Sequence, residues 1–286
     1  MPVVSHELMQ SQQTKPVWGY RVRWFVLVAC PCAAALSLLF SDGCSSTPKR
    51  DTTQLTGAPA APMPVQSDPP PTDSAAPSAP DIIKEAAAKA PALFEGAGWR
   101  DLFDGQSLTG WAETRFAGRG EIECRDGLIL MKMGNPFTGL NWTNDFPKMN
   151  YEVALDAMRV MGSDFFCGLT VPVGDSFCSL IVGGWGGSLL GISSLDGLDA
   201  SENETTKYRN FETRRWYRIR LRVTEKRIQA WIDSEKLVDV DTSDKRISLR
   251  PGDIEMSKPM GLACWETSAL LREIKVRRVD GPAPRK

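Results

Sequence analysis

Five acidic side chains between the predicted central strands are the candidates for acid–base chemistry. They are Asp164, Asp196, Asp199, Glu202 and Glu204. Cleavage of a glycosidic bond uses two carboxyl groups, one as acid and the other as base or nucleophile. Glu202 and Glu204 would point to the same side of an extended segment, and Asp164 would come from a different strand. We therefore expect Asp164, Glu202 and Glu204 to flank a sugar as catalytic residues.

The same acids have two other interpretations. They could be solvated loop residues, or they could hold a structural Ca²⁺ ion, because carboxylate, amide and backbone oxygens suit this hard cation. The sequence leaves these alternatives open, and it predicts no other cofactor.

Trp185 is the candidate for binding a sugar ring. It stands in the sequence GGWGG, where the flanking glycines let a ring lie exposed or let a ligand approach the backbone. Aromatic faces stack against the C–H surfaces of sugars, so we expect Trp185 to be a platform, with Asp196 and Asn203 as polar substrate contacts. Trp142 and Trp265 are weaker candidates. The alternative for all three tryptophans is a place in the core of a β-sandwich.

The distribution of histidine excludes several kinds of catalysis. The only histidine, His6, precedes a hydrophobic leader. The rest of the chain therefore has no Ser-His-Asp or Cys-His catalytic group and no His-ligated zinc or iron site. The formal net charge is −1 at pH 7, which gives no reason to expect a nucleic acid as partner.

Four of the seven cysteines fall in the predicted folded region: Cys124, Cys167, Cys178 and Cys264. Cys167 and Cys178 are equally distant from the centre of a predicted turn at 171–174, so a disulfide between them is feasible in an oxidising compartment. Two buried thiols are the alternative. No CxxC spacing is present, so a zinc site is not expected.

Residues 216–240 carry the clearest structural pattern. Apolar side chains alternate with polar ones over 217–223, again over 228–232, and once more over 237–240, with short polar turns between them. This pattern predicts three antiparallel strands that share one apolar face. Residues 151–160 alternate in the same way, with Glu152 and Asp156 on the outward face. Because such a face needs a second sheet to cover it, we expect an all-β, two-sheet antiparallel β-sandwich over 96–280.

Arg218, Arg220 and Arg222 form a row on the other face of the first of these strands. The row could bind an anionic polysaccharide. It could equally pair with carboxylates on neighbouring strands and discourage edge pairing.

Several phrases of the sequence resemble one bacterial domain family. The opening GWRDLFDGQSLTGW at 98–111 is the most diagnostic, and the segments 123–131, 215–223 and 271–279 agree with it. These segments are similar to the 3-keto-disaccharide hydrolase family, in which this chain looks like a divergent bacterial lipoprotein. The resemblance implies a concanavalin-like jelly roll related to laminin-G domains, and a carbohydrate substrate. In the family's reaction the keto group acidifies the adjacent C–H bond, which allows elimination and hydration. Residues 162–197 depart from the family's phrases. The alternative to a hydrolase is therefore a non-catalytic carbohydrate-binding or surface-adhesion module.

The N-terminal region predicts export. Residues 24–40 form an apolar run after basic residues, and Cys44 follows in SDGCSS. This layout is typical of an export signal and resembles a lipoprotein signal, so we expect 1–44 to be the signal and Cys44 to carry a lipid anchor. A plain secreted protein and a retained membrane anchor are the alternatives. The expected location is the cell envelope, periplasmic or on the outer surface, with the membrane and a carbohydrate as partners.

Two further segments flank the predicted domain. Residues 45–95 are rich in Pro, Ala and Ser and predict an extended tether. Within it, 81–89 has the pattern of a short helix with Asp81 as N-cap and Glu85–Lys89 at i,i+4. Residues 281–286 form a short tail.

Overall fold

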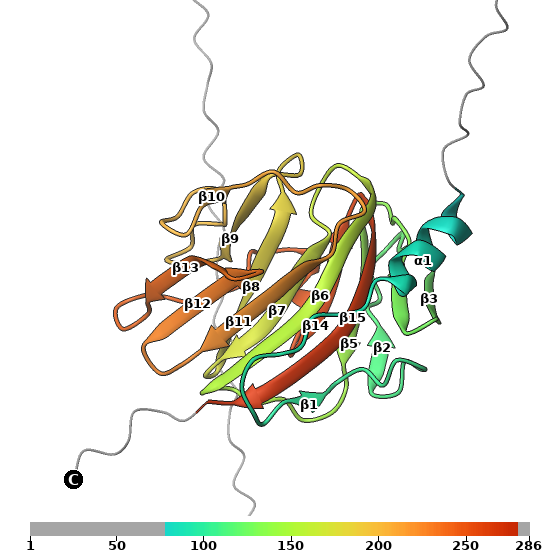
Figure 1. Cartoon of the computed structure of the whole chain (residues 1–286). Helices are drawn as coiled ribbons and strands as arrows, with labels where there is room; N and C mark the ends of the chain where they lie inside the picture. The colour runs from blue at the N-terminus through green and yellow to red at the C-terminus, as the bar shows by residue number, and fades with distance from the viewer. Residues whose placement is uncertain (1–77, 280–286) are drawn as a thin grey trace, which may run out of the picture. The chain divides into compact units, whose positions relative to one another are not determined.

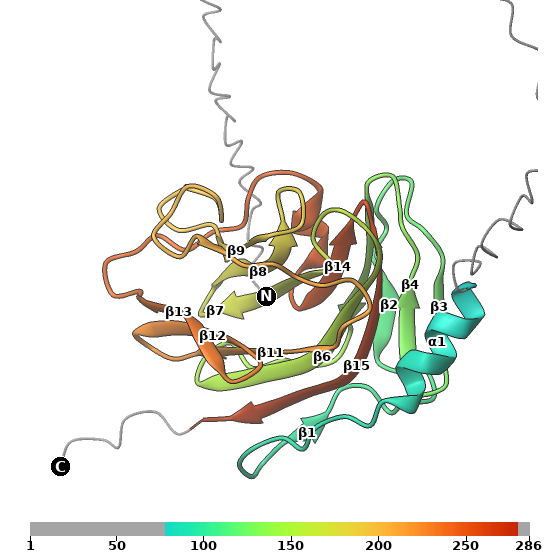
Figure 2. The ribbon, with the colours of Figure 1, turned by 45° about the horizontal axis from the view of Figure 1, so that its top comes forward.

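The computed structural model describes residues 78–279, and these form two antiparallel β-sheets packed face to face (Figures 1 and 2). The two-sheet antiparallel sandwich expected from the sequence is confirmed. The first sheet has eight strands. Its order is β13 (Glu235–Asp241), β12 (Arg227–Ile232), β11 (Tyr217–Val223), β6 (Tyr151–Gly162), β15 (Thr267–Arg278), β4 (Leu128–Met131) and β3 (Ile122–Arg125), with β1 (Arg100–Asp101) paired to β15.

The second sheet has seven strands and lies behind the first in Figure 1. Its order is β10 (Lys207–Tyr208), β9 (Leu189–Ser193), β8 (Ser176–Gly184), β7 (Cys167–Val173), β14 (Gly261–Trp265), β5 (Phe137–Trp142) and β2 (Trp111–Glu113). A 3₁₀ helix, η1 (Asp253–Ser257), precedes β14. Neighbouring strands of this sheet come from distant parts of the chain, because β14 lies between β5 and β7.

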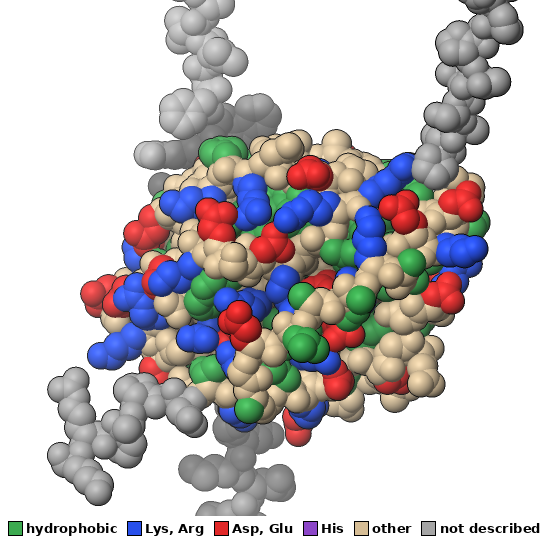
Figure 3. All heavy atoms as spheres, in the orientation of Figure 1, with side chains coloured by type: hydrophobic (Ala, Val, Ile, Leu, Met, Phe, Trp, Pro, Cys, Tyr) green, Lys and Arg blue, Asp and Glu red, His purple; other side chains and the backbone are tan. Residues whose placement is uncertain are grey.

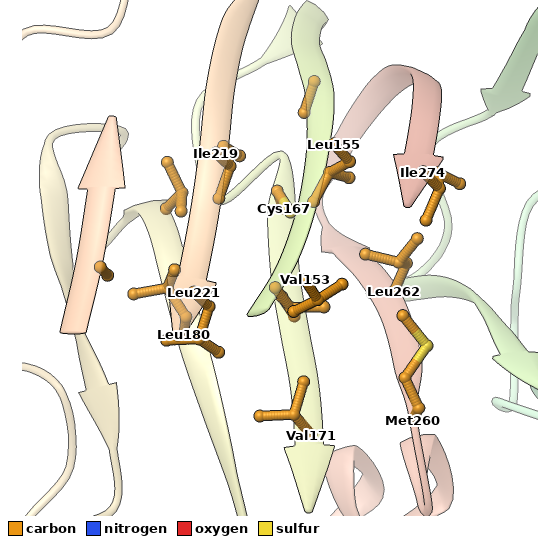
Figure 4. Packing of buried hydrophobic residues seen from close by; sticks show 14 of the residues in the cluster. Val153, Leu155, Cys167, Val171, Leu180, Ile219, Leu221, Met260, Leu262 and Ile274 are labelled. Carbon is orange, nitrogen blue, oxygen red and sulfur yellow. The ribbon is translucent and has the colours of Figure 1, made fainter. Parts of the chain in front are cut away.

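The core fills the space between the two sheets. Figure 4 shows aliphatic side chains of β6, β11 and β15 facing those of β7, β8 and β14. Leu155, Ile219 and Leu221 from the first sheet, and Leu169 and Leu180 from the second, are completely buried. Their burial removes apolar surface from water at about 25 cal/mol per Å², which stabilises the pair of sheets.

The expected three-stranded pattern at 216–240 is present as β11, β12 and β13. In β11 the apolar residues are buried and the arginines are part-exposed, in strict alternation. The hairpin between β3 and β4 turns at Asp126 and Gly127, with φ values of 52° and 78°. Two positive φ angles in succession are what a tight hairpin turn requires, so Asp-Gly at this place fixes the register.

The outward face of β6 is buried, although it carries two carboxylates. Glu152 is 0% exposed, and it lies opposite Arg222 of β11 and Arg277 of β15. Both arginines bind it, at 2.8 and 2.9 Å, and Arg220 adds a contact at 3.3 Å. The arginine row therefore pairs with a neighbouring strand, as one of its two interpretations required.

Asp156 repeats this arrangement four residues further along β6, on the same face of the strand. It lies opposite Arg218 on β11 and Arg272 on β15, and it forms an ion pair with each of them. A charge removed from water is tolerated only when it is paired and hydrogen-bonded. The two carboxylates therefore tie the three central strands of the first sheet together.

A helix and an extended strap cover the rest of that face. Helix α1 (Ala79–Ala88) packs Ile82, Ile83 and Ala86 against apolar side chains of β4, β6 and β15. Its N-cap is Ser78, and not Asp81 as expected; Asp81 occupies position N3, where it accepts a hydrogen bond from the Ser78 hydroxyl at 2.5 Å. Within the described part of the chain, no helix has the length and hydrophobicity to span a membrane.

The strap, residues 89–99, runs from α1 towards β1. Its backbone carbonyls accept hydrogen bonds from three arginines of the sheet: Lys89 from Arg272, Ala92 from Arg218, and Glu95 from Arg277. The guanidinium groups of Arg218 and Arg277 also lie over the rings of Phe94 and Trp99, at 3.7 and 4.5 Å. Cation–π contacts of this kind add to the attachment of the strap.

The disulfide considered feasible between Cys167 and Cys178 is not formed in this structure; both cysteines are free and buried, as the alternative had it. The hairpin turns at Gly174–Asp175, two residues later than predicted, so Cys167 lies opposite Val182 and Cys178 opposite Val171. Four residues along a strand separate the thiols by roughly 13 Å, which no disulfide spans. Burial raises the pKa of Cys178 to about 12, so this thiol is an unreactive part of the core.

We predict that Glu152→Gln lowers the free energy of unfolding by about 3 kcal/mol, because it leaves three buried or half-buried arginines without their anion. Glu121→Gln is the matched control, because Glu121 is 79% exposed and pairs with Lys132 at the surface. A surface pair of this kind contributes below about 1 kcal/mol. Urea unfolding at pH 7 measures both. Equal losses in the two variants would show that the buried network does not stabilise the fold.

Candidate functional site

A pocket of about 540 Å³ lies on the outer face of the second sheet; we call it the Trp185 pocket. Ser179, Ile181 and Ser193 belong to its lining, and they alternate along β8 and β9 with Leu180 and Ile192, which belong to the main core. Successive side chains of a strand point to opposite faces, so the pocket opens away from the core. The remaining lining residues are Phe137, Asp164, Phe165, Trp185, Arg250, Pro251, Gly252, Asp253, Ile254 and Trp265.

Aromatic side chains form much of the wall. Trp265 meets the ring of Phe137 edge-to-face, with 4.5 Å between the ring centroids, and the ring of Phe165 lies 6.4 Å from it. Together with Ile181 and Ile254 these rings form a small apolar cluster outside the main core. Because the rings hold one another in place, this side of the pocket is a fixed apolar surface.

Hydroxyl groups cross the floor of the same region. Thr170, Ser179 and Ser193 lie opposite one another on β7, β8 and β9. The Thr170 and Ser179 hydroxyls are 2.7 Å apart and hydrogen-bond each other. Ser179 and Ser193 line the pocket, so the apolar wall stands beside a polar floor.

Three charged side chains border the pocket: Asp164, Arg250 and Asp253. Arg250 forms an ion pair with Asp199 at 3.3 Å, and its guanidinium carbon lies 5.9 Å from the centroid of the Trp185 ring. Asp253 stands in the first turn of η1 and is exposed. Within residues 78–279 its carboxylate has no hydrogen-bond or ion-pair partner, so it is free to act on a ligand.

Trp185 is held on a tight turn between β8 and β9. Its backbone has φ of 49°, and its side chain is 41% exposed at the pocket. Asp164 fixes this turn from one side, because its Oδ2 accepts the N–H of Gly186 at 3.0 Å while its Oδ1 accepts the N–H of Phe165 at 2.7 Å.

Arg159 fixes the turn from the other side. This arginine, 6% exposed, donates from Nη2 to the carbonyls of Gly183 at 3.2 Å and Gly187 at 2.8 Å, which bracket Trp185. Its Nη1 donates to the carbonyl of Phe211. Burial lowers the pKa of Arg159, but arginine stays charged at neutral pH. Between them Asp164 and Arg159 set the position of the indole ring.

The structure brings together two of the residues expected at a sugar site, Asp164 and Trp185, which share one pocket. Trp265, a weaker candidate, lines it too. Glu202, Glu204 and Asp196 do not line this pocket. Glu204 and Asp196 instead form ion pairs with Lys245, at 2.9 and 3.5 Å.

Asn203, expected to contact the substrate, forms hydrogen bonds within its own loop. Its side-chain amide nitrogen donates to the carbonyls of Ile192, Leu198 and Asp199, and its oxygen accepts from Thr205. These bonds fold residues 195–206 into a compact loop, and the acids of SENET do not line the pocket.

A functional role was not predicted from the sequence for Arg250 and Asp253, which line the pocket. They belong to RPGD, which precedes η1. The phrase reads as an ordinary turn, and nothing local shows that the segment returns across the outer face of the second sheet. Only the pairing of β14 between β5 and β7 places it there.

The acidic loop was a candidate for binding a metal ion. Among the residues that the structure describes, no group of three or more His, Cys, Asp or Glu side chains converges as a metal site would require. A structural Ca²⁺ ion was one of the alternatives for these acids, and it stays untested.

A family model assigns most of this sandwich. The profile of the 3-keto-alpha-glucoside-1,2-lyase-like domain matches residues 98–277. A search among curated proteins found no match.

Several solved structures are similar in fold at low sequence identity. A protein described as a glycosyl hydrolase from Parabacteroides distasonis is 15% identical, with a TM-score of 0.43 over 64% of this chain and 94% of its own. A carbohydrate-binding module from Bacillus subtilis is 10% identical, with a TM-score of 0.41 over 59% of this chain and 95% of its own. Domain 4 of an arabinanase from Geobacillus stearothermophilus, solved with arabinotriose, is 12% identical, with a TM-score of 0.40 over 59% and 82%.

We predict that Arg159→Met loosens the turn that carries Trp185. Losing the donor to two buried carbonyls costs about 1–3 kcal/mol, so amide hydrogen exchange at Gly186 and Gly187 should speed up at least about tenfold. Arg125→Met is the matched control, because Arg125 is exposed. Unchanged exchange at these two amides in Arg159→Met would contradict the role given to Arg159.

Proposed function

Because the chain belongs to the family of 3-keto-alpha-glucoside-1,2-lyase-like domains, we propose that it binds a glycoside in the Trp185 pocket and cleaves it after oxidation at C3. The single observation that supports this proposal is the composition of the pocket. A fixed aromatic wall, a hydroxyl-bearing floor and three charged side chains surround about 540 Å³, which lies within the usual range for small-ligand sites.

Binding of the sugar is assigned to the aromatic side chains. The exposed face of Trp185 stacks on one C–H surface of the ring, and Trp265 supplies a second apolar contact. Ser193, which is 4% exposed, is the floor hydroxyl assigned to a hydrogen bond with the sugar, because Ser179 is completely buried and bonded to Thr170. Asp164 and Arg159 act through the turn and are positioning residues.

The chemistry is assigned to Asp253 and Arg250. The 3-keto group acidifies the C–H bond at C2, and a carboxylate takes that proton as general base. The electron pair of the broken C–H bond forms the C1–C2 double bond as the bond from C1 to the glycosidic oxygen breaks. That oxygen leaves with a proton from water. Arg250 stabilises the negative charge that develops on the keto oxygen.

Asp253 is preferred to the other acids because its carboxylate is free. Both oxygens of Asp164 already accept backbone N–H groups. Glu202 and Glu204, first expected as the acid–base pair, do not line the pocket. This assignment also needs no histidine, which agrees with the sequence.

The rival is a carbohydrate-binding module without catalysis. One observation favours it: of the two carboxylates at the pocket, only Asp253 is uncommitted, so the acid–base pair of an ordinary glycosidase is not assembled. Binding and turnover therefore have to be measured separately.

We predict that Asp253→Asn lowers the rate of cleavage of 3-ketoglycosides by at least about a hundredfold and leaves their Kd within a few-fold. Asp244→Asn, a change at an exposed acid outside the pocket, is the control and should behave as wild type. Calorimetry and product analysis on a panel of glycosides and 3-ketoglycosides measure both quantities. Binding without turnover in the wild type would establish the rival, and absence of binding would refute both proposals.

We propose further that the protein is exported and anchored in the cell envelope through Cys44. The residues that support this, 1–44, lie outside those the structure describes. The support is the basic flank, the apolar run at 24–40 and the cysteine that follows it.

Cys44→Ala is expected to abolish incorporation of radiolabelled palmitate and to release the protein from the membrane fraction of a bacterial host. Cys32→Ala, a cysteine inside the apolar run, is the control. Labelling that survives in Cys44→Ala would contradict the lipid anchor.

A further inference from the structure

A second pocket, of about 530 Å³, lies on the outer face of the first sheet, beside the strap; we call it the Arg272 pocket. Trp216, Arg218 and Arg272 line it together with the start of the strap and the segment 212–215. Figure 3 views this side of the molecule and shows basic and acidic side chains intermixed over it. No residue of this pocket belongs to the Trp185 pocket.

Positive charge prevails in its lining. Five cationic side chains, from Lys89, Arg214, Arg215, Arg218 and Arg272, face three carboxylates, from Asp156, Glu212 and Asp233. Two of the carboxylates are already neutralised. Asp156 pairs with Arg218 and Arg272, and Asp233 pairs with Arg215 at 2.9 Å. Glu212 is exposed at the rim.

The two most buried arginines of the lining each have a nitrogen that donates no hydrogen bond within the part of the chain that the structure describes. Arg218 uses Nε for Asp156 and Nη2 for the Ala92 carbonyl, while Arg272 uses Nε for Asp156 and Nη1 for the Lys89 carbonyl. Among the described residues, Nη1 of Arg218 and Nη2 of Arg272 have no acceptor. Neither nitrogen is sealed away from solvent, in contrast to Nη1 of Arg215, which is buried without a partner.

These two guanidinium groups are also fixed in place. Their side chains are only 13% and 7% exposed. Arg218 lies over the ring of Phe94 at 3.7 Å, and Arg272 over the ring of Trp216 at 4.1 Å. Because their orientation is set before a ligand arrives, a ligand would gain their hydrogen bonds at little entropic cost.

The other arginines on this face of the sheet differ, because they share a carboxylate and do not line the Arg272 pocket. Arg220, Arg222 and Arg277 converge on Glu152, a carboxylate that is completely buried. At the Arg272 pocket a cavity remains beside the guanidinium groups, and Arg214 at its edge forms no ion pair within residues 78–279.

We propose that the Arg272 pocket binds a tetrahedral oxyanion, a phosphate or sulfate group carried by a small molecule. Each of the two guanidinium groups, which share Asp156, has one nitrogen left over, and together these two nitrogens offer charged N–H donors to separate oxygens of such a group. Arg214 adds positive charge at the mouth, where Lys89 also lies, paired with Glu85 at 3.3 Å. The pocket holds more than an inorganic ion, so the anion is a substituent on a body of about the size of a sugar.

The test titrates the full chain with sodium sulfate, sodium phosphate and glucose 6-phosphate, each against sodium chloride at equal ionic strength. Calorimetry is expected to show saturable binding of all three, with glucose 6-phosphate the tightest. Arg214→Gln combined with Lys89→Gln should raise the Kd of each ligand about tenfold. Arg218→Lys keeps the charge but removes the guanidinium group, so it should raise the Kd of each ligand as well. This second variant keeps the test informative if the other one is unstable.

The control combines Lys226→Gln with Arg227→Gln, which removes the same charge at the start of β12, outside the pocket. It should leave each Kd within twofold of wild type. Absence of binding beyond the chloride reference would overturn the proposal, and so would equal weakening in the control, since attraction would then be a matter of net charge. Glucose 6-phosphate binding no tighter than inorganic phosphate would refute the part concerning the larger body.

Discussion

The fold depends on a constraint at its central strand, β6, which is buried on both faces and yet carries three charged side chains. Its inward face packs Val153 and Leu155 into the core. Its outward face holds Glu152 and Asp156, each opposite one arginine of β11 and one of β15. A buried carboxylate without such partners would cost several kcal/mol. The register of the three central strands is therefore specified twice, because a slip of one residue would misplace the apolar side chains and break both charge clusters.

The third charge of β6, Arg159, connects this constraint to the Trp185 pocket. It points between the sheets, and its donors hold the turn of Trp185 and the carbonyl of Phe211. Backbone carbonyls carry only partial charge, so they satisfy a guanidinium group without neutralising it, and Asp164 lies close enough to raise the pKa of Arg159 against the effect of burial. The position of Trp185 is thus set by the strand that organises the core, and a rigid platform loses less entropy when a sugar binds.

The parts of the structure that follow from local sequence could be predicted, and those that need distant pairing could not. The alternation of apolar and polar residues in 217–223 predicted β11, because every second side chain of a strand faces the core. The pairing of Cys167 with Cys178 failed because a hairpin of Gly, Asp and Pro residues can turn at more than one place, and a shift of two residues separated the thiols. Glu202 and Glu204 do not line the Trp185 pocket, and Asn203 between them uses its amide to close their loop. Arg250 and Asp253 reach the pocket only through strand order, which no local pattern encodes.

The absence of histidine from the folded region restricts which reaction the Trp185 pocket can support. Hydrolysis of an unactivated glycoside needs a pair of carboxyl groups with different protonation states around the glycosidic bond, and the pocket has one free carboxylate. Elimination next to a ketone is less demanding, because the substrate's own carbonyl group acidifies the C–H bond that breaks. The protein then has to supply one base and one cation near the carbonyl oxygen. In the proposed reaction Asp253 and Arg250, which belong to a single short segment, would meet that requirement, and the aromatic wall would not have to take part in the chemistry.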